Sequence, residues 1–190
     1  MKVLFASNNL GKLSEVRNVL ADTDIETLSL ADVANETIVD EDQPSFELNA
    51  YKKAKTYFDL YGIPTLADDS GLCVDALHGA PGIFSARFAK LGATDSDNNM
   101  LLLKQLEGVT NRKAHFICVL CFVMQDDVHY FKGYLHGMIH TEPIGNSGFG
   151  YDPIFYVPEE KATLATLGQQ KKNTISHRAK ALQEWKKSLL

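Results

Sequence analysis

The sequence contains little cysteine, no long hydrophobic run and no block of basic residues, and each shortage excludes a class of protein. Its three cysteines among 190 residues show neither metal-ligand spacing nor the even number of a disulfide framework, so we expect a reducing compartment. The longest apolar run, residues 116–124, is far too short to span a bilayer. We therefore expect no association with membranes.

The net charge and the N-terminal stretch narrow the expected ligands and cellular location. The formal net charge of -5 gives no general attraction for nucleic acid, so a phosphate ligand would need local basic residues or a metal. The stretch MKVLFASNN has too short an apolar part for a signal peptide, which predicts a cytoplasmic protein. With 45% hydrophobic and 23% charged residues, the chain is predicted to be a single globular domain over residues 1–190.

The pattern of apolar residues predicts an α/β fold. The region 115–124 is almost continuously apolar, as in a central strand buried on both faces, and Asp126 and Asp127 mark a turn that makes a hairpin with the next strand. Thr94 and Asp97 have the spacing of a helix capping box. Strands are expected at 2–6, 63–67, 115–124 and 128–139, and helices at 12–20, after Ser45 to 61, from Thr94 to before 108, and from Thr174 or Ser176 to 190.

Two adjacent carboxylates, Asp68 and Asp69, follow the expected strand 63–67 in the stretch LADDSGL. Two like charges at a strand end are costly unless a cation or hydrogen-bond donors neutralise them. An Asx-type turn, in which Asp69, Ser70 and Gly71 cap a loop, explains the same residues. The stretch alone leaves both interpretations open.

The stretch SNNLGK, residues 7–12, lies where a strand is expected to lead into a helix. Free backbone N–H groups and the helix dipole favour an anion there, so the stretch predicts a phosphate-binding segment. It is not a P-loop, because Ala6 and Leu13 stand where that motif needs Gly and Ser or Thr. The alternative is an asparagine N-cap followed by a solvated lysine.

An acidic stretch, VDEDQP at residues 39–44, precedes the helix that carries Lys53. Such a run is most often a solvated loop. If Glu41 meets Asp68 or Asp69 in space, oxygen ligands from two segments and the substrate phosphates would form a usual Mg²⁺ site. The sequence alone does not place these residues together.

Two further stretches stand out near the C-terminus. GNSGFGYDP, residues 145–153, is either a tight loop that lets backbone and an aromatic face approach a flat ligand, or a plain exit from the hairpin. KKNTISHRAKA, residues 171–181, puts His177 and Arg178 at the start of the last helix, where surface charge is the alternative to a binding role.

Taken together, SNNLGK, the acidic stretch with Glu41, NAYKKA, LADDSGL, GAPGIFSARF, GFGYDP and SHR have an order and spacing that closely resemble the inosine triphosphate pyrophosphatase family, also called the Ham1/RdgB-like nucleoside triphosphate pyrophosphatases. The resemblance covers essentially the whole chain. It implies an α/β fold of two lobes around a long twisted mixed β-sheet with flanking helices, an active site in the cleft between the lobes, and a homodimer.

The reaction that the resemblance implies is the Mg²⁺-dependent hydrolysis of inosine, deoxyinosine and xanthosine triphosphates (ITP, dITP and XTP) to the monophosphate and pyrophosphate. This reaction cleanses the nucleotide pool. The implied partner is a purine nucleoside triphosphate, with no nucleic acid and no membrane.

Residue roles follow from the same resemblance. Asp69 is the implied general base, and Glu41 with Asp68 and Asp69 are the implied Mg²⁺ ligands. The two aspartates titrate as a pair, so the choice of the base rests on the resemblance. The implied substrate-binding residues are Ser7, Asn8, Asn9, Leu10, Gly11, Lys12, Lys53 and Lys172 for the triphosphate, and Ser70, Phe149, Gly150, Tyr151, Asp152, His177 and Arg178 for the remainder of the pocket.

Base selection and two alternatives complete the expectations. Hypoxanthine and xanthine carry an oxygen acceptor at position 6 where adenine carries a donor, so a donor from Arg178 or His177 would favour the former. One alternative is a sister pyrophosphatase for modified pyrimidine nucleotides. The other is a nucleotide-binding sensor without turnover, which the intact acidic pair argues against.

Overall fold

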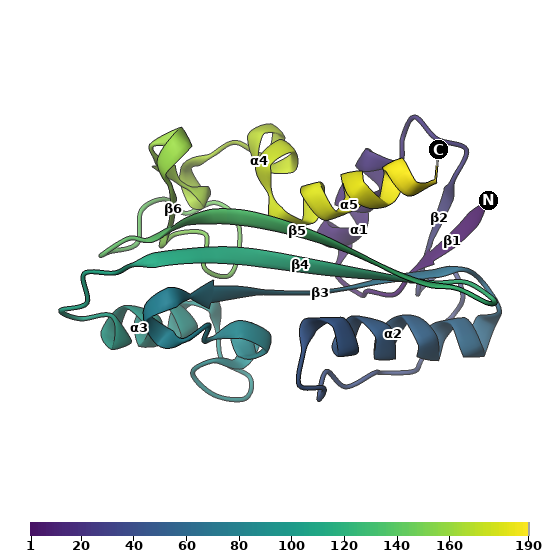
Figure 1. Ribbon diagram of the computed structural model, residues 1–190, viewed down its shortest axis with the longest axis horizontal. Helices are drawn as coiled ribbons and strands as arrows, with labels where there is room; N and C mark the ends of the chain where they lie inside the picture. Colours follow the sequence, from purple (N-terminus) through teal and green to yellow (C-terminus); the bar gives the residue numbers. More distant parts are fainter. Residues whose placement is uncertain (190) are drawn as a thin grey trace. The chain divides into compact units, whose positions relative to one another are not determined.

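The computed structural model describes residues 1–189 and contains a mixed seven-stranded sheet with flanking helices (Figure 1). The strand order is β2-β1-β3-β4-β5-β6-β7. The strands are β1 (Lys2–Phe5), β2 (Glu26–Ser29), β3 (Thr65–Val74), β4 (Lys113–Val123), β5 (Val128–Ile139), β6 (Phe155–Val157) and β7 (Ala162–Thr163), and the helices are α1 (Leu10–Val19), α2 (Phe46–Tyr61), α3 (Asp95–Gln105), α4 (Gln169–Ile175) and α5 (His177–Ser188). The predicted α/β fold with a mixed sheet is confirmed.

The chain divides into two compact units, each assembled from separate segments. Unit 1 contains residues 1–70, 118–133 and those from 177 onward, and unit 2 contains residues 71–117 and 134–176. Strands β3, β4 and β5 each contribute to both units. The single domain over residues 1–190 stays a prediction, and Leu190, the predicted end of the last helix, lies outside the described residues.

In unit 1, β1 pairs in parallel with both β2 and β3. Helices α1 and α5 pack on one face of these strands and α2 packs on the other (Figure 1). Trp185 of α5 is fully buried, and its ring centroid lies 5.4 Å from that of Phe122. The start of α2 is the predicted one, because the Ser45 hydroxyl accepts a hydrogen bond from the N–H of Leu48.

In unit 2, α3 begins with the predicted capping box. The Thr94 hydroxyl accepts from the N–H of Asp97, and the Asp97 carboxylate accepts from the N–H of Thr94. Leu102 and Leu106 then enter a core shared with the second half of β3 and with β6. This core holds α3 in place. Asp95 and Asn99, in the first two turns of α3, contact Gly150 of a glycine-rich loop.

The strand that carries the acidic pair is longer than predicted. Because β3 continues to Val74, Asp68 and Asp69 lie inside the strand rather than at its end, and the Asx-type turn is also wrong. The reason is local compensation, since hydrogen-bond donors satisfy both carboxylates and the cations Lys12 and Arg178 also neutralise Asp68. Charges so compensated do not need a loop exposed to water.

The helix ends also differ from the prediction. Helix α1 begins at Leu10 rather than 12. The C-terminal region forms two helices, with Ser176 between them, so the helix start after Ser176 is confirmed and the start at Thr174, which lies inside α4, is wrong. Strands β6 and β7 have three and two residues, too few for a periodic pattern to show.

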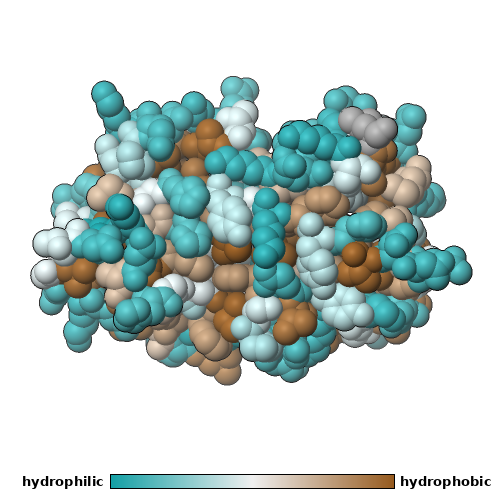
Figure 2. All heavy atoms as spheres, in the orientation of Figure 1, coloured by the Kyte–Doolittle hydropathy of each residue, from teal (hydrophilic) through white to brown (hydrophobic). Residues whose placement is uncertain are grey.

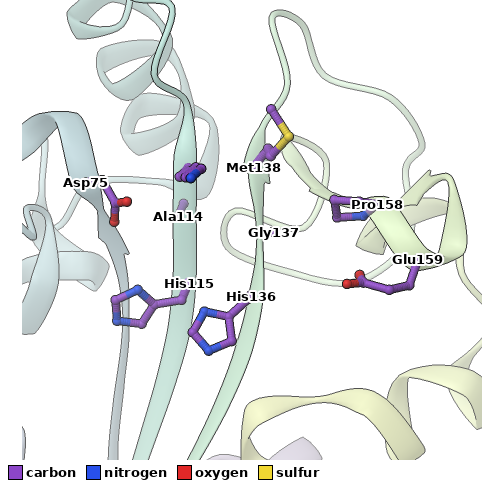
Figure 3. A pocket seen from close by; sticks show the side chains of 9 residues that line it. Asp75, Ala114, His115, His136, Gly137, Met138, Pro158 and Glu159 are labelled. Carbon is purple, nitrogen blue, oxygen red and sulfur yellow. The ribbon is translucent and has the colours of Figure 1, made fainter.

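The outer surface mixes hydrophilic and hydrophobic side chains, and Figure 2 shows the hydrophobic ones in small groups among hydrophilic residues on the face drawn. Within residues 1–189, no helix is long and apolar enough to cross a membrane.

Candidate active site

The two carboxylates of the acidic pair lie on opposite faces of β3, because successive side chains of a strand alternate. Asp68 contacts Lys12 of α1 and Arg178 of α5, whereas Asp69 contacts Asn49 of α2. Asp68 is 1% exposed and Asp69 is 5% exposed. Asp68 and Asp69 therefore lie in different electrostatic environments, although both belong to unit 1.

Asp68 is neutralised by its partners. Lys12 Nζ lies 2.9 Å from Oδ2 and 3.1 Å from Oδ1, Arg178 Nε donates to Oδ2 at 3.2 Å, and the Ser70 hydroxyl donates to the same oxygen at 3.2 Å. Burial opposes ionisation, but the charges of Lys12 and Arg178 outweigh it and hold the pKa of Asp68 well below its ordinary value. Asp68 therefore stays ionised and is not available as a base.

Arg178 is itself buried, with 3% of its surface exposed. Its Nη1 donates to Glu15 Oε2 at 3.0 Å while Nε donates to Asp68. Burial lowers the pKa of Arg178, but the charge of Asp68 leads the interactions that raise it above its ordinary value. The guanidinium is thus held between two carboxylates of unit 1, and Glu15 is a partner that the sequence pattern did not reveal.

His177 precedes Arg178 at the start of α5. Burial and the neighbouring positive charge of Arg178 lower the pKa of His177 well below its ordinary value. Its imidazole is therefore neutral near pH 7, with one ring nitrogen able to donate and the other able to accept.

Asp69 accepts hydrogen bonds on both oxygens. The Asn49 side-chain Nδ2 donates to Oδ2 at 2.9 Å, and the N–H of Ser70 donates to Oδ1 at 2.8 Å. Neither donor carries a charge. The Asp69 carboxylate is therefore oriented by its partners without being neutralised by them.

Lys53 joins the acidic pair to Glu41. Its Nζ donates to the backbone carbonyl of Asp68 at 2.5 Å and to Glu41 Oε1. Burial raises the pKa of Asp69 to about 6, Lys53 opposes this rise, and the negative charges of Glu41 and Asp68 add to it. The structure thus places Glu41 next to the acidic pair, which the sequence alone did not predict.

The predicted phosphate-binding segment forms the start of α1. Asn9 caps the helix, with Oδ1 accepting from the N–H of Lys12 at 3.1 Å, and the Ser7 hydroxyl accepts from the N–H of Asn9 at 3.2 Å. The N-cap is therefore confirmed, but the solvated lysine is wrong because Lys12 Nζ binds Asp68. A cavity of about 160 Å³ adjoins this segment and is lined in part by Ser7, Asn8, Lys12, Glu41 and Lys53.

The glycine-rich loop belongs to unit 2. Gly145, Gly148 and Gly150 have φ values of 87°, 90° and 62°, a region that glycine enters without steric cost. Phe149 is 59% exposed, whereas Tyr151 is 4% exposed and its hydroxyl donates to the Ser85 carbonyl at 2.8 Å. Only Phe149 of this aromatic pair presents its ring at the surface of the unit.

Side chains of α3, of α4 and of the loop segment itself hold this loop. Lys172 Nζ lies 2.5 Å from Asp152 Oδ2, and that carboxylate oxygen also accepts from the N–H of Phe149. On α3, Asp95 accepts from the N–H of Gly150 at 2.6 Å and Asn99 donates to the Gly150 carbonyl at 3.0 Å. The sequence pattern did not identify Asp95 and Asn99, since a short polar residue on a helix gives no signal of its backbone partner.

Comparison with known proteins decides the family. The family model described as the Ham1 family matches residues 3–188 of the chain. The chain belongs to the Ham1 family. The predicted family resemblance is therefore confirmed.

Relatives of this Ham1 protein have similar lengths. It is 45% identical over 184 residues to the dITP/XTP pyrophosphatase of Geobacter sulfurreducens, covering 95% of this chain and 92% of that protein. It is 46% identical over 187 residues to the dITP/XTP pyrophosphatase of Desulforamulus reducens, covering 97% and 93%. The solved structure of a HAM1 protein from Coxiella burnetii matches with a TM-score of 0.95 and 38% identity, covering 100% of this chain and 98% of that chain.

In this Ham1 protein, the implied site residues form two groups, each within one unit. Unit 1 brings together Ser7, Asn8, Asn9, Lys12, Glu41, Lys53, Asp68, Asp69, Ser70 and Arg178, and unit 2 brings together Phe149, Gly150, Asp152 and Lys172. Leu10 and Gly11 lie in the first turn of α1, His177 begins α5, and Tyr151 is part of the core of unit 2.

The acidic residues of unit 1 have the chemistry, but not the arrangement, of a complete metal site. Among residues 1–189, no three His, Cys, Asp or Glu side chains are already arranged to hold a metal ion. Glu41 and Asp69 nevertheless match Mg²⁺ in chemistry, because both are carboxylates and the negative charge of Glu41 disfavours ionisation of Asp69. A divalent cation would relieve this repulsion.

Proposed function

We propose that this Ham1-family protein hydrolyses non-standard purine nucleoside triphosphates, such as dITP, XTP and ITP, to the monophosphate and pyrophosphate. One observation carries the proposal: β3 holds two adjacent carboxylates, one fixed in its ionised form and the other made more basic, beside a helix N-terminus. The relatives named dITP/XTP pyrophosphatase support this substrate class.

Asp69 is the proposed general base. Its oxygens are oriented by Asn49 and Ser70, and no cation binds its carboxylate directly among the hydrogen bonds and ion pairs described for residues 1–189. A water molecule that loses a proton to Asp69 attacks the α-phosphorus. A new P–O bond forms, the bond from that phosphorus to the oxygen bridging the α- and β-phosphates breaks, and pyrophosphate leaves with the bond electrons.

Glu41 and Asp69 are the residues that we propose to hold Mg²⁺. Bound there, Mg²⁺ would neutralise phosphate charge and orient the triphosphate. Asp68 was also an expected ligand, but it binds Lys12 and Arg178, so we propose that its main role is to fix these two cations. Lys53 holds Glu41 and the backbone of Asp68 together and thereby fixes the spacing of the acidic group.

The start of α1 is the proposed phosphate-binding segment. Residues 8–11 are exposed, and the free N–H groups at the N-terminus of this ten-residue helix can donate to phosphate oxygens. Lys12 and Lys53 line the adjoining cavity and supply positive charge. Ser7, Asn8, Asn9, Leu10 and Gly11 would contribute backbone or side-chain donors.

Nucleoside contacts are proposed separately for each unit. In unit 2, the exposed ring of Phe149 would stack on a purine, while Asp152 and Lys172 hold its loop and Tyr151 anchors the loop in the core. In unit 1, the neutral His177 can donate to a 6-oxygen. We propose that Arg178 mainly fixes Asp68 and Glu15 rather than reads the base, because its Nε and Nη1 donate to these two carboxylates.

A product assay with a panel of triphosphates tests the function. With Mg²⁺, we expect dITP, XTP and ITP to yield monophosphate and pyrophosphate faster than ATP, GTP or a modified pyrimidine triphosphate. Preference for the pyrimidine would favour the sister activity, and binding without products would favour a sensor. The resemblance also leads us to propose a cytoplasmic homodimer, and light scattering of the purified protein would measure the mass.

A further inference from the structure

Asn49 is a polar residue whose side chain is buried, so its amide must find hydrogen-bond partners inside the protein. It lies in the first turn of α2 and is 1% exposed. Its Nδ2 donates to Asp69 Oδ2 at 2.9 Å, and its Oδ1 accepts from the N–H of Gln43 at 2.9 Å. One buried amide therefore contacts both the proposed base and the acidic loop, defined as residues 39–44.

The orientation of this amide follows from its partners. The N–H of Gln43 can only donate, so the oxygen of Asn49 must face it, and the NH₂ group then faces Asp69. An ionised carboxylate only accepts, which suits that NH₂ group. No other orientation satisfies both partners, so the amide holds them at a fixed separation.

We propose that Asn49 is a positioning residue that holds Asp69 and the acidic loop at a fixed separation. The proposed base and Glu41, which belongs to that loop, thereby keep their relative positions. This inference rests on the proposed function for its catalytic consequence, but not for the contacts themselves. Asn49 is buried and acts through Asp69 and through the backbone of Gln43. Misplacement of a catalytic group by about 1 Å can lower a rate by roughly 10²-fold.

Lys52 provides a matched control. It lies in the same helix and also holds the acidic loop, with Nζ 3.0 Å from the Asp40 carbonyl and 2.7 Å from Asp42 Oδ1. Its described partners do not include Asp69. Substitution of Lys52 therefore loosens the loop without removing a contact of the proposed base.

The first experiment is a kinetic double-mutant cycle with Asn49→Ala and Asp69→Asn. We expect Asn49→Ala to lower kcat by roughly 10- to 100-fold in the wild-type background, with a smaller change in KM. In the Asp69→Asn background the same substitution should lower kcat by less than about 3-fold, because no base remains to be misplaced. Lys52→Met should have the same effect in both backgrounds.

Equal factors for Asn49→Ala in the two backgrounds would overturn the positioning role while leaving the proposed function intact. An inactive wild-type protein would instead contradict the proposed function. The contacts then remain testable by thermal unfolding, which needs no substrate.

The second experiment uses Asn49→Asp, which keeps an acceptor for Gln43 but places a carboxylate against Asp69. We expect Asn49→Asp to lower Tm, and Asp69→Asn to raise Tm by more in the Asn49→Asp background than in the wild type, because only there does the new amide face a carboxylate that can accept from it. An equal change in Tm in the two backgrounds would overturn the contact. Hydrogen exchange at the Gln43 amide should also accelerate in Asn49→Ala, and unchanged exchange would contradict the link to the acidic loop.

Discussion

Asp68 and Asp69 are neighbours in β3, yet their carboxylates face opposite sides of the strand and have pKa values shifted in opposite directions. Asp68 binds two cationic side chains, and Asp69 binds two uncharged donors. Because side chains alternate between the two faces of a strand, the two adjacent carboxylates meet different sets of partners. This division would let one carboxylate organise cations while the other serves as the proposed base.

The first prediction concerns the base itself. Asp69→Asn keeps the shape of the side chain but removes the proton acceptor, so we expect turnover of dITP to fall by roughly 10²-fold or more while the nucleotide still binds. Pyrophosphate release measures turnover, and equilibrium binding to the variant checks that the site is preserved. Turnover near the wild-type rate would assign the base to another residue.

The same substitution should change how stability depends on pH when a chelator is present. The pKa of Asp69 is raised to about 6 in the folded protein, above its value of about 4 in an unfolded chain. Ionisation of Asp69 therefore opposes folding: the penalty is absent below about pH 4, grows between about pH 4 and 6, and is complete above about pH 6.

Asp69→Asn also sets an NH₂ group against one of the two donors that Asp69 accepts from, at a cost that does not depend on pH. We therefore expect the difference in free energy of unfolding between Asp69→Asn and the wild type to favour the variant by roughly 2 kcal/mol more at pH 8, with excess chelator, than at pH 4. Denaturant unfolding of both proteins at the two pH values measures this change. A difference that is the same at pH 4 and pH 8 would show that ionisation of Asp69 does not oppose folding.

Arg178 is predicted to act on stability more than on base selection. Arg178→Ala leaves Asp68 and Glu15 without this partner inside unit 1, and removal of one member of a buried ion pair costs about 3–5 kcal/mol. We expect a marked loss of stability and similar fractional losses of kcat/KM for ITP and ATP. Selective loss for ITP would instead restore base reading to Arg178.

Gly148 and Gly150, on either side of Phe149, allow a matched comparison of two substitutions in the same loop. A methyl group at Gly148, where φ is 90°, would collide with Asp152 and Lys172, whereas at Gly150, where φ is 62°, it meets no described atom within 4 Å. We therefore expect Gly148→Ala to raise KM for dITP several-fold more than Gly150→Ala. Steady-state kinetics of both variants provide the comparison, and equal effects would contradict a role of the loop geometry in binding.

The sequence predicted the parts of the fold that leave a local signal. Ser45 and Thr94 cap helices as expected, and the hairpin strand β5 has the predicted bounds, because capping and alternation depend on neighbouring residues. The extent of β3 was wrong, since its continuation through two carboxylates depends on Lys12 and Arg178, which lie 56 and 110 residues from Asp68.

The candidate site shows the same limit. Residue types in SNNLGK and LADDSGL indicated phosphate and acid–base chemistry, and the family resemblance assigned the roles. The partners that fix those residues were not predictable from local patterns: Glu15 holds Arg178, and Asn49 holds Asp69. Such partners are ordinary polar residues on helices, and only the folded arrangement shows what they contact.

The most direct test of the central claim is hydrolysis of dITP in ¹⁸O-labelled water with Mg²⁺, followed by mass spectrometry of the products. Attack of water on the α-phosphorus predicts one ¹⁸O atom in the deoxyinosine monophosphate and unlabelled pyrophosphate. Label in pyrophosphate or release of labelled orthophosphate would place the attack on another phosphorus and contradict the account.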